Sequence, residues 1–547
     1  MHRAVLSAAF AVLAATSALA QPGSGVAHGF RLYGPFGNRD TYLVDPNGAI
    51  VHTWTGSYVP GNGIYLEADG TLLRAGNVII GGPPLGGRGG SAQRIAFDGT
   101  ILWDYRYATA THWAHHDIEP MPNGNVLFIA WDWMTAADAI AAGRDPALIA
   151  GANWLPDHIV EVRQTGPTTG DIVWEWHLMD HVIQDVDPTK ANYGVVGDHP
   201  ELVDINFPPV LVFDGDWNHA NAVSYDPVRD LIVFNSRNQG EFYVLDHSTT
   251  TAEAAAHTGG THGKGGDILY RWGNPAAYRA GTAADQKLFG HHGAMIIPQG
   301  IPGASNVLVF NNKAGTPIGR NYSSVLELEL PPTFNLAPGE AFGPTDPIWD
   351  YTAAMPGTFY SSGMSNAERL PNGNTLICSG RQRGWMFEVN PAKQIVWEYF
   401  NTIPSPTALV FQVSYVDRSL WADVAAANAS TPVAQGFDLV AGTPHAGSAY
   451  VLLGSASGTT PVLPLGGGAT LPLRWDAYTA FTLTNAGGPA LPEFVGVLDA
   501  QGRATANLRL PPLPGLEGIT FHHAFAVVDS VSLAVTSTSN PVPLTLQ

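Results

Sequence analysis

The amino-acid sequence predicts an all-β protein, because it has few charges, many turn residues and a strand pattern that recurs along the chain. Only 13% of the 547 residues are charged, against roughly 25% in an average globular protein. The 61 glycines and 42 prolines favour many turns between short strands. A hydrophobic content of 45% suffices for a core, and the length predicts one large domain with at least one smaller one.

The N-terminus has the composition of a secretory signal peptide. Arg3 precedes an apolar run, and residues 18–20 form a small-residue cleavage site. We therefore expect residues 1–20 to be a signal peptide, cleaved near Ala20, and the mature protein to be periplasmic or secreted. No later stretch has about 18 uninterrupted apolar residues, so no membrane span is expected. The single cysteine, Cys378, excludes an internal disulfide.

The formal net charge of −20 restricts the partners of this protein. Nucleic acid and anionic membranes bind to positive surfaces, so neither is expected as a partner. An anionic small molecule would need a local pocket of arginine and histidine side chains.

A strand that ends in an aromatic residue recurs six times in the first three quarters of the chain. These closing strands are residues 50–54, 101–105, 172–176, 268–272, 348–351 and 395–399. All-β units of roughly 40–75 residues with one aromatic motif each are typical of a β-propeller. We therefore predict a six-bladed β-propeller over residues 28–425, closed by pairing of the N-terminal strands with residues 409–415. Insertions at residues 133–156, 180–214 and 250–266 are expected to cap one face.

The composition changes after Trp421. Residues 426–435 are small and polar, which favours a linker. Residues 436–547 contain almost no charge and no lysine, and short alternating runs favour β-strands. We predict a small β-sandwich here, with an accessory role.

Histidines recur at one phase of the predicted inner strands, just before the apolar part of each strand. They are His115, His219 and His291, followed by His116, Asn221 and His292. Inner strands of a propeller surround its central channel, so these side chains are expected to converge on the channel mouth. The alternative is a structural role, in which the rings bond to the backbone of neighbouring blades.

Several motifs resemble those of the bacterial arylsulfate sulfotransferases, which are exported six-bladed propellers. They are DWNHANAVSYD at residues 216–226, GHHGAMIIP at residues 290–298, the PNGN turns and the closing strands with W-E-W or W-E-Y. The resemblance covers residues 28–425. It implies transfer of a sulfuryl group from a small aromatic sulfate ester to a phenolic acceptor, independent of PAPS and without a cofactor.

The resemblance also implies roles for individual residues. In that family a histidine attacks sulfur and carries the sulfate, while further histidines and an arginine hold its oxygens. The W-x-H-x-N motif maps onto His219 and Asn221, the H-x-A motif onto His291 or His292, and the arginine onto Arg320. Imidazole is a good nucleophile at neutral pH, and a guanidinium matches the geometry of an oxyanion.

The sequence departs from the family at the phase of the nucleophilic histidine in the last blade, where Met364 stands. His115 and His116 are the best-placed substitutes. Tyr360 and Arg381 lie near the same mouth and are candidates to bind an anion without covalent chemistry.

Two other function classes remain open at this level. One is a metal-binding enzyme that uses His115, His116, His219, His291 and His292 with a nearby aspartate, although no short metal-ligand motif supports it. The other is a propeller that binds a ligand or partner without catalysis. The sequence carries no signal for the oligomeric state or for the identities of donor and acceptor.

Overall fold

The computed structural model describes residues 25–78, 85–149, 151–207, 215–337, 339–403, 407–466, 468–529 and 534–547. The predicted signal peptide, residues 1–20, lies outside the described residues. Strands dominate the described chain, which confirms the all-β prediction. Its α-helices are short: α1 (Ala136–Ala141), α2 (Thr251–Ala254) and α3 (Ala477–Thr484). None of the helices among these residues is long and apolar enough to cross a membrane.

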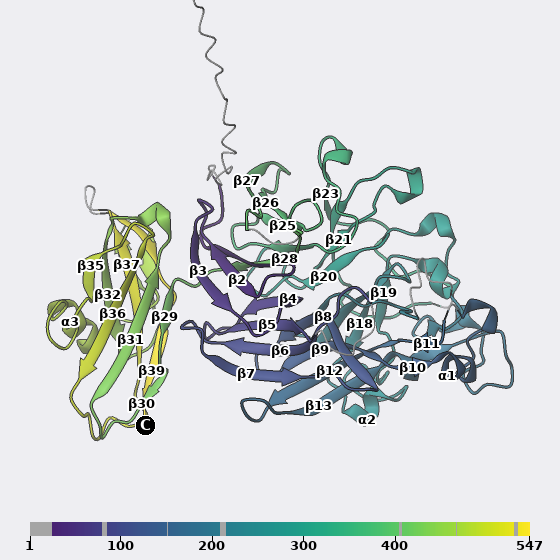
Figure 1. Ribbon diagram of the computed structural model, residues 1–547, viewed down its shortest axis with the longest axis horizontal. Coiled ribbons are helices and arrows are strands. Elements are labelled where there is room, and N and C mark those ends of the chain that lie inside the picture. The colour runs from purple at the N-terminus through teal and green to yellow at the C-terminus, as the bar shows by residue number, and fades with distance from the viewer. Residues whose placement is uncertain are drawn as a thin grey trace, which may run out of the picture.

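Six sheets of four strands each, found within the described residues, make up the larger part of the molecule (Figure 1). The first two contain β28 (Val410–Val416), β1 (Phe30–Pro35), β2 (Asp40–Val44) and β3 (Ile50–Thr55), then β4 (Pro60–Leu66), β5 (Leu72–Asn77), β6 (Gly90–Ile95) and β7 (Ile101–Arg106). The third and fourth contain β8 (His112–Pro120), β9 (Val126–Asp132), β12 (Asp157–Gln164) and β13 (Gly170–His177), then β16 (Val223–Asp226), β17 (Leu231–Ser236), β18 (Glu241–Asp246) and β19 (Tyr270–Trp272). The last two contain β20 (His292–Ile296), β21 (Val307–Asn311), β22 (Ser324–Leu328) and β23 (Trp349–Tyr351), then β24 (Asn366–Arg369), β25 (Thr375–Ser379), β26 (Trp385–Val389) and β27 (Ile395–Phe400).

The first sheet joins the two ends of this part of the chain. Strand β1 pairs antiparallel with β28, so that Phe30 lies opposite Val416 and Tyr33 opposite Val413. This pairing confirms the predicted closure, and it leaves β28 as the innermost strand of the first sheet. Closure of this kind removes an exposed sheet edge.

The innermost strands contact one another in a closed sequence: β28 with β4, β4 with β8, β8 with β16, β16 with β20, β20 with β24, and β24 with β28. Side chains bond across these contacts. Asn366 exchanges two hydrogen bonds with the backbone of Val413, at 2.9 and 3.0 Å, and Gln412 donates to the backbone oxygen of Ile64 at 3.0 Å. The arrangement is propeller-like.

All six predicted closing strands are the last strand of a sheet, namely β3, β7, β13, β19, β23 and β27. Their tryptophans explain the repeat, because several bond to the next sheet. Trp103 of β7 donates to the backbone oxygen of Thr169 at 3.1 Å, and Trp397 of β27 donates to that of Pro46 at 2.8 Å. These two indoles therefore both fill the space between two sheets and satisfy their N–H groups.

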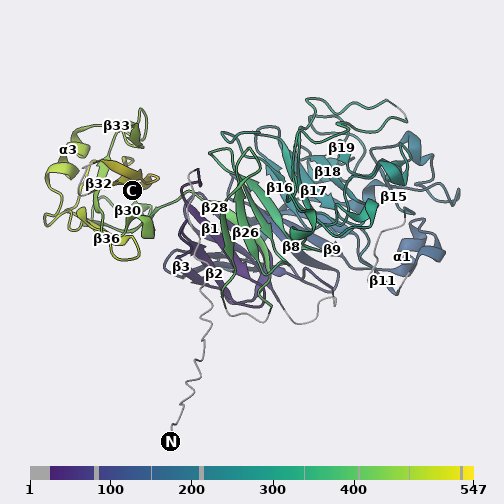
Figure 2. The ribbon, with the colours of Figure 1, turned by 90° about the horizontal axis from the view of Figure 1, so that it is seen from above.

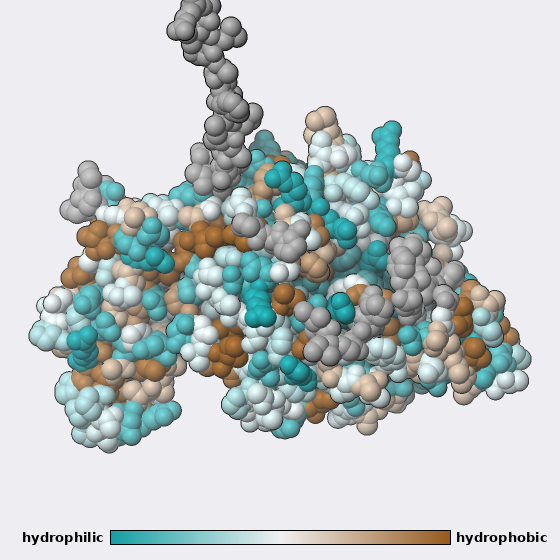
Figure 3. All heavy atoms as spheres, in the orientation of Figure 1, coloured by the Kyte–Doolittle hydropathy of each residue, from teal (hydrophilic) through white to brown (hydrophobic). Residues whose placement is uncertain are grey.

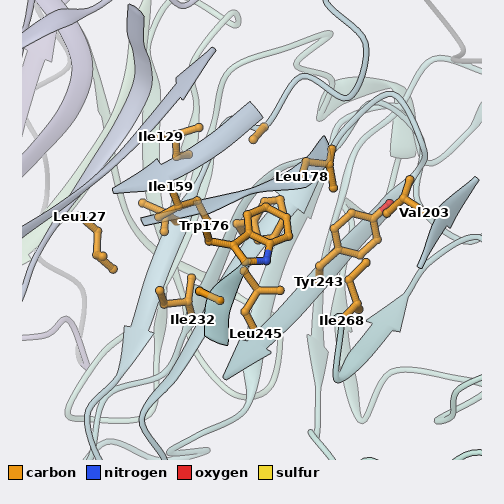
Figure 4. Close-up of a cluster of buried hydrophobic side chains, with 14 of the residues drawn as sticks. Leu127, Ile129, Ile159, Trp176, Leu178, Val203, Ile232, Tyr243, Leu245 and Ile268 are labelled. Carbon is orange, nitrogen blue, oxygen red and sulfur yellow. The ribbon is translucent and has the colours of Figure 1, made fainter. Parts of the chain in front are cut away.

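The core between the third and fourth sheets shows how adjacent sheets pack (Figure 4). Leu127, Ile159 and Trp176 of the third sheet meet Ile232 and Leu245 of the fourth, and all of them are buried. Full burial of each such aliphatic side chain contributes about 1.5–3 kcal/mol.

The predicted insertions contain short strands and the two α-helices of this part. The first holds β10 (Met134–Thr135), α1 and β11 (Asn153–Trp154), the second holds β14 (Val182–Ile183) and β15 (Val203–Asp204), and the third holds α2. Helices α1 and α2 each begin with a capping box, at Thr135 and Thr250.

The C-terminal part forms a separate set of sheets beside β1 to β3, as both ribbon views show (Figures 1 and 2). One sheet contains β29 (Leu420–Ala422), β31 (Val433–Val440) and β36 (Arg503–Leu510). Another contains β30 (Ala426–Ala427), β39 (Val542–Leu546), β37 (Thr520–Val528), β32 (Ala449–Ser455) and β35 (Val495–Val497), with β38 (Val535–Thr538) on β37. A small hairpin pairs β33 (Leu463–Gly466) with β34 (Ala469–Leu471). The two larger sheets share one buried core, to which Phe437 and Phe525 contribute.

The predicted linker at residues 426–435 is wrong. It contains β30 and the start of β31, and β29 before it pairs with β31. Strand β30 pairs with β39 at the far end of the chain, where Ala426 lies opposite Thr545. Small polar residues can form strands when a distant segment supplies their hydrogen bonds, and local composition does not reveal this.

The two parts of the molecule meet at a mixed surface. Trp421 is buried, its ring stacks on Phe97 at 4.5 Å, and its Nε1–H donates to the backbone oxygen of Gly70 at 3.2 Å. The backbone N–H of Thr443 donates to Asp45 at 2.7 Å. Figure 3 shows hydrophilic and hydrophobic residues interspersed over one face of both parts.

Candidate functional site

A pocket of about 590 Å³ lies among the inner strands and the loops that precede or follow them. Its polar lining includes three of the predicted histidines and two arginines: His116, His219, His292, Arg237 and Arg381. The walls also include apolar side chains, among them Phe36, Leu85 and Phe411. Within the described chain, residues of the three predicted insertions do not line it.

Backbone irregularities turn side chains toward this pocket. Four of its non-glycine lining residues have a positive φ: Asn62 (103°), His116 (52°), His219 (54°) and Met364 (61°). Register shifts interrupt the β4–β5, β8–β9 and β20–β21 pairs at or beside residues that line the pocket. Bulges of this kind occur next to active sites because they redirect a side chain without ending the sheet.

His219 is held by a carboxylate. Its Nδ1–H donates to Oδ2 of Asp216, and the other oxygen of Asp216 accepts a bond from Trp131 Nε1 at 3.1 Å. The His219 side chain is 17% exposed, and its Nε2 has no hydrogen-bond partner among the described residues. An aspartate that orients an imidazole in this way leaves Nε2 available for proton transfer.

His292 is held by an amide instead. Asn312 donates from Nδ2 to the backbone oxygens of Ser361 and Met364, both at 2.8 Å, which orients its amide group. Oδ1 of Asn312 therefore accepts the Nδ1–H of His292, at 2.7 Å. The Nε2 of His292 carries the lone pair and accepts the backbone N–H of Met364 at 3.2 Å. Burial, together with the charge of Arg237, holds the pKa of His292 well below its usual range, so the ring is neutral.

His115 and His116 form a pair of which only the second lines the pocket. Their Nδ1 atoms lie 2.8 Å apart, and His115 Nε2 lies 2.8 Å from Asp157 Oδ1. Burial lowers the pKa of both rings well below the usual value. Gly87 packs on His116 so closely that a Cβ there would lie 2.0 Å from the ring, which leaves room for glycine only.

His291 and Asn221 lie beneath the pocket and do not line it. His291 is fully buried and donates from Nε2 to the backbone oxygen of Glu241 at 2.9 Å. Burial lowers the pKa of His291 to about 3. Asn221 donates to the backbone oxygen of His291 at 3.1 Å and accepts from Asn235 at 2.5 Å. The bond from His291 to the backbone of the neighbouring sheet is the kind of contact that the structural alternative described.

Two further predicted residues lie away from the pocket lining. Arg320 is exposed, in the turn between β21 and β22, and the predicted position of the pocket arginine is therefore corrected. Tyr360 is half-buried, and its backbone N–H donates to Gln382 at 3.3 Å.

The pocket arginine that sequence reasoning missed is Arg237. It follows β17 directly, its Nη1 donates to Asn238 at 3.0 Å, and burial lowers its pKa. The available signal was an arginine directly after the apolar strand that follows the His219 motif. Arg381 is exposed but also lines the pocket.

Met364 stands in the pocket wall, where its backbone contacts His292. The pocket therefore still contains histidines, although a methionine stands where the family has its nucleophilic histidine. The five predicted histidines do not converge as one metal site, because His115 and His291 lie behind the lining. Within the described chain, the two His and Asp groups that are close enough to hold an ion lie elsewhere.

The fold and the pocket define an all-β, propeller-like protein with a histidine- and arginine-lined pocket that suits an anionic substrate. A family model described as arylsulfotransferase (ASST) matches residues 37–401. That match spans more than half of the 547 residues, and the chain belongs to the arylsulfotransferase family. The family supports an aryl sulfotransferase-like function with aryl substrates.

Two solved structures show a distant likeness. A periplasmic gluconolactonase from Pseudomonas aeruginosa is 11% identical, with 71% of this chain and 99% of that chain covered and a TM-score of 0.36. A putative 6-phosphogluconolactonase from Bacteroides fragilis is 12% identical, with 73% and 100% covered and a TM-score of 0.34. A comparison with curated proteins finds no significant match.

Proposed function

We propose that this protein is an exported, PAPS-independent arylsulfate sulfotransferase that moves a sulfuryl group from a phenolic sulfate ester to a phenol. The observation that carries the proposal is the pairing of a neutral His292 with a carboxylate-held His219 in one pocket that also contains Arg237. Export rests on the signal-like composition of residues 1–20.

The proposal includes the architecture. The six four-stranded sheets are six blades of one propeller, supported by the closed sequence of inner-strand contacts. The sheets from β29 onward form a β-sandwich with an accessory role, supported by the core that its two larger sheets share.

The different partners of the two histidines assign them different roles, since an amide holds His292 and a carboxylate holds His219. His292 is neutral, and its Nε2 attacks sulfur once it gives up the bond from Met364. An N–S bond forms as the S–O bond to the aryl group breaks. His219, protonated beside Asp216, gives its proton to the leaving phenoxide.

The second half of the reaction reverses these roles. The acceptor phenol enters the same pocket and loses its proton to Nε2 of His219. Its oxygen attacks sulfur, the N–S bond breaks, and His292 becomes neutral again. Arg237 and Arg381 bind the three sulfonyl oxygens through both steps, while Phe36 and Phe411 offer apolar surface for the aromatic ring.

The test is turnover of p-nitrophenyl sulfate with phenol as acceptor, combined with detection of a sulfated histidine. Wild-type protein mixed with donor alone should gain one sulfonyl group on His292, detected by mass spectrometry at alkaline pH. His292→Ala should lose that label and essentially all turnover. A label on another residue, or full turnover by His292→Ala, would contradict the assignment.

Arginine variants give a matched pair. Arg237→Ala should lower turnover by about 10²-fold or more, as loss of one preorganised donor typically does. Arg320→Ala removes an exposed arginine outside the pocket and should leave turnover within about threefold of wild type. Equal losses in both variants would contradict the position of the sulfate site.

A further inference from the structure

A second group of histidines lies at one end of the third sheet and takes no part in the pocket. It contains Asp132 at the end of β9, His158 near the start of β12 and His177 at the end of β13. His158 lies directly opposite His177 in the ladder, and their rings stack at 4.8 Å. One ligand atom from each of the three residues falls within 4.8 Å of the others.

His158 has a buried nitrogen without a hydrogen bond. Its side chain is 1% exposed, and its Nε2 bonds to the hydroxyl of Tyr107 at 3.0 Å. Its Nδ1 lies 3.1 Å from Oδ1 of Asp132, which is close enough for an ion pair but is not aligned for a regular hydrogen bond. This buried nitrogen therefore has a carboxylate beside it but no well-aligned hydrogen bond, which calls for an explanation.

His177 and Asp132 complete the group from its exposed side. Nδ1 of His177 lies 2.7 Å from Oδ2 of Asp132. The side chains are 33% and 22% exposed, so the group opens to solvent. His112 of β8 lies next to it, with its ring 6.2 Å from that of His158.

The spacing suits a small divalent ion. With metal–ligand bonds of about 2.0–2.1 Å and tetrahedral angles, two ligand atoms lie about 3.3 Å apart. When a nitrogen and an oxygen bind the same ion, the lone pair of the nitrogen points at the ion and not at the oxygen. Oδ1 of Asp132 has this off-axis position relative to Nδ1 of His158. The bond from His158 Nε2 to Tyr107 is the type of outer contact that orients a metal-binding imidazole.

We propose that Asp132, His158 and His177 bind a divalent transition-metal ion of the Zn²⁺ type. Two imidazole nitrogens and one carboxylate favour such an ion over Ca²⁺ or Mg²⁺, which prefer oxygen ligands. Three protein ligands leave a position for water or for His112. The ion would join the ends of three neighbouring strands, β9, β12 and β13.

The molecule contains a matched comparison group at His181, His257 and Asp267. There, His181 is satisfied without an ion, since Nδ1 bonds to Asp267 and Nε2 to the backbone oxygen of Ala254, both at 2.8 Å. His257 is 61% exposed. His257→Ala therefore removes a similar histidine–aspartate contact without affecting the proposed site.

The experiment measures Zn²⁺ binding to the full chain after treatment with a chelator, by calorimetric titration and by metal analysis after dialysis. Wild type and His257→Ala should each bind one more equivalent of Zn²⁺ than His177→Ala or Asp132→Asn. If the last two variants still bind that equivalent, their affinity for it should be at least tenfold lower. His177 and Asp132 are partly exposed, so circular dichroism should show that both variants are folded. Zn²⁺ should raise the unfolding temperature of wild type more than that of His177→Ala.

Three results would overturn the proposal. The first is that wild type binds no Zn²⁺. The second is that His177→Ala and Asp132→Asn bind Zn²⁺ as wild type does. The third is that the bound equivalent is lost from His257→Ala or His219→Ala instead. X-ray absorption at the zinc edge gives a further check, because the proposed site requires two imidazole ligands. None of these measurements depends on sulfotransferase activity.

Discussion

Asp216→Asn tests the role of His219 with little change in shape. Oδ1 of Asp216 accepts the Nε1–H of Trp131 at 3.1 Å, and an asparagine oxygen can keep that bond. The amide nitrogen then faces Nδ1 of His219, where the carboxylate was. A protonated His219 loses its counter-charge, and the neutral ring is driven to the tautomer with its proton on Nε2.

The size of the effect follows from the lost charge pair. Two unit charges with centres about 4 Å apart interact by about 4 kcal/mol at an effective dielectric constant near 20. Asp216 is buried and the His219 side chain is 17% exposed, so solvent screens the pair only partly. Since each 1.4 kcal/mol is a factor of ten in rate, the expected loss of kcat/KM is about 10²–10³-fold.

The assay compares two donors with one acceptor. Phenolate is a stronger base than p-nitrophenolate, so phenyl sulfate needs the proton from His219 more than p-nitrophenyl sulfate does. Asp216→Asn should therefore lose more activity with phenyl sulfate. A variant within about threefold of wild type on both donors, or one that loses the same factor on both, would refute the role of His219 as the acid.

Two further predictions concern stability. Trp421→Ala should lower the free energy of unfolding by about 3–5 kcal/mol, because the indole is buried and stacks on Phe97. Trp475→Ala, at a site that is 52% exposed, is the control. Equal urea midpoints for the two variants would contradict this prediction. Burial raises the pKa of Asp117 to about 7, so the folded state keeps a proton that the unfolded state has lost above about pH 4. Stability should fall as pH rises from about 4 to about 7, and Asp117→Asn should make this fall smaller in urea unfolding at pH 4.5 and 7.5; identical falls would count against the assignment.

The sequence by itself determined the strand content and the order of the repeats. The six closing strands were recognisable because an aromatic at a fixed place in each short apolar strand is a local pattern. The same indoles fill the space between sheets, so the local pattern and the packing requirement coincide. The closure of the first sheet by residues near 410 followed from the need to leave no exposed edge.

Only the tertiary structure decided which polar residues share the pocket. His115 and His116 are neighbours in sequence, but the interrupted register between Ala114 and Ile118 places only His116 in the lining. In the same way His292 lines the pocket while His291 is buried beneath it. A strand reverses its side-chain direction at every residue, so one bulge changes the outcome.

Long-range pairing decided the rest. Arg237, rather than Arg320, reaches the pocket because the loop after β17 lies beside His219, a proximity between segments 18 residues apart in the chain. Residues 426–427 form a strand because β39, more than a hundred residues later, pairs with them. Contacts between distant segments depend on how the sheets pack against one another, and that information is not present in any local stretch of the sequence.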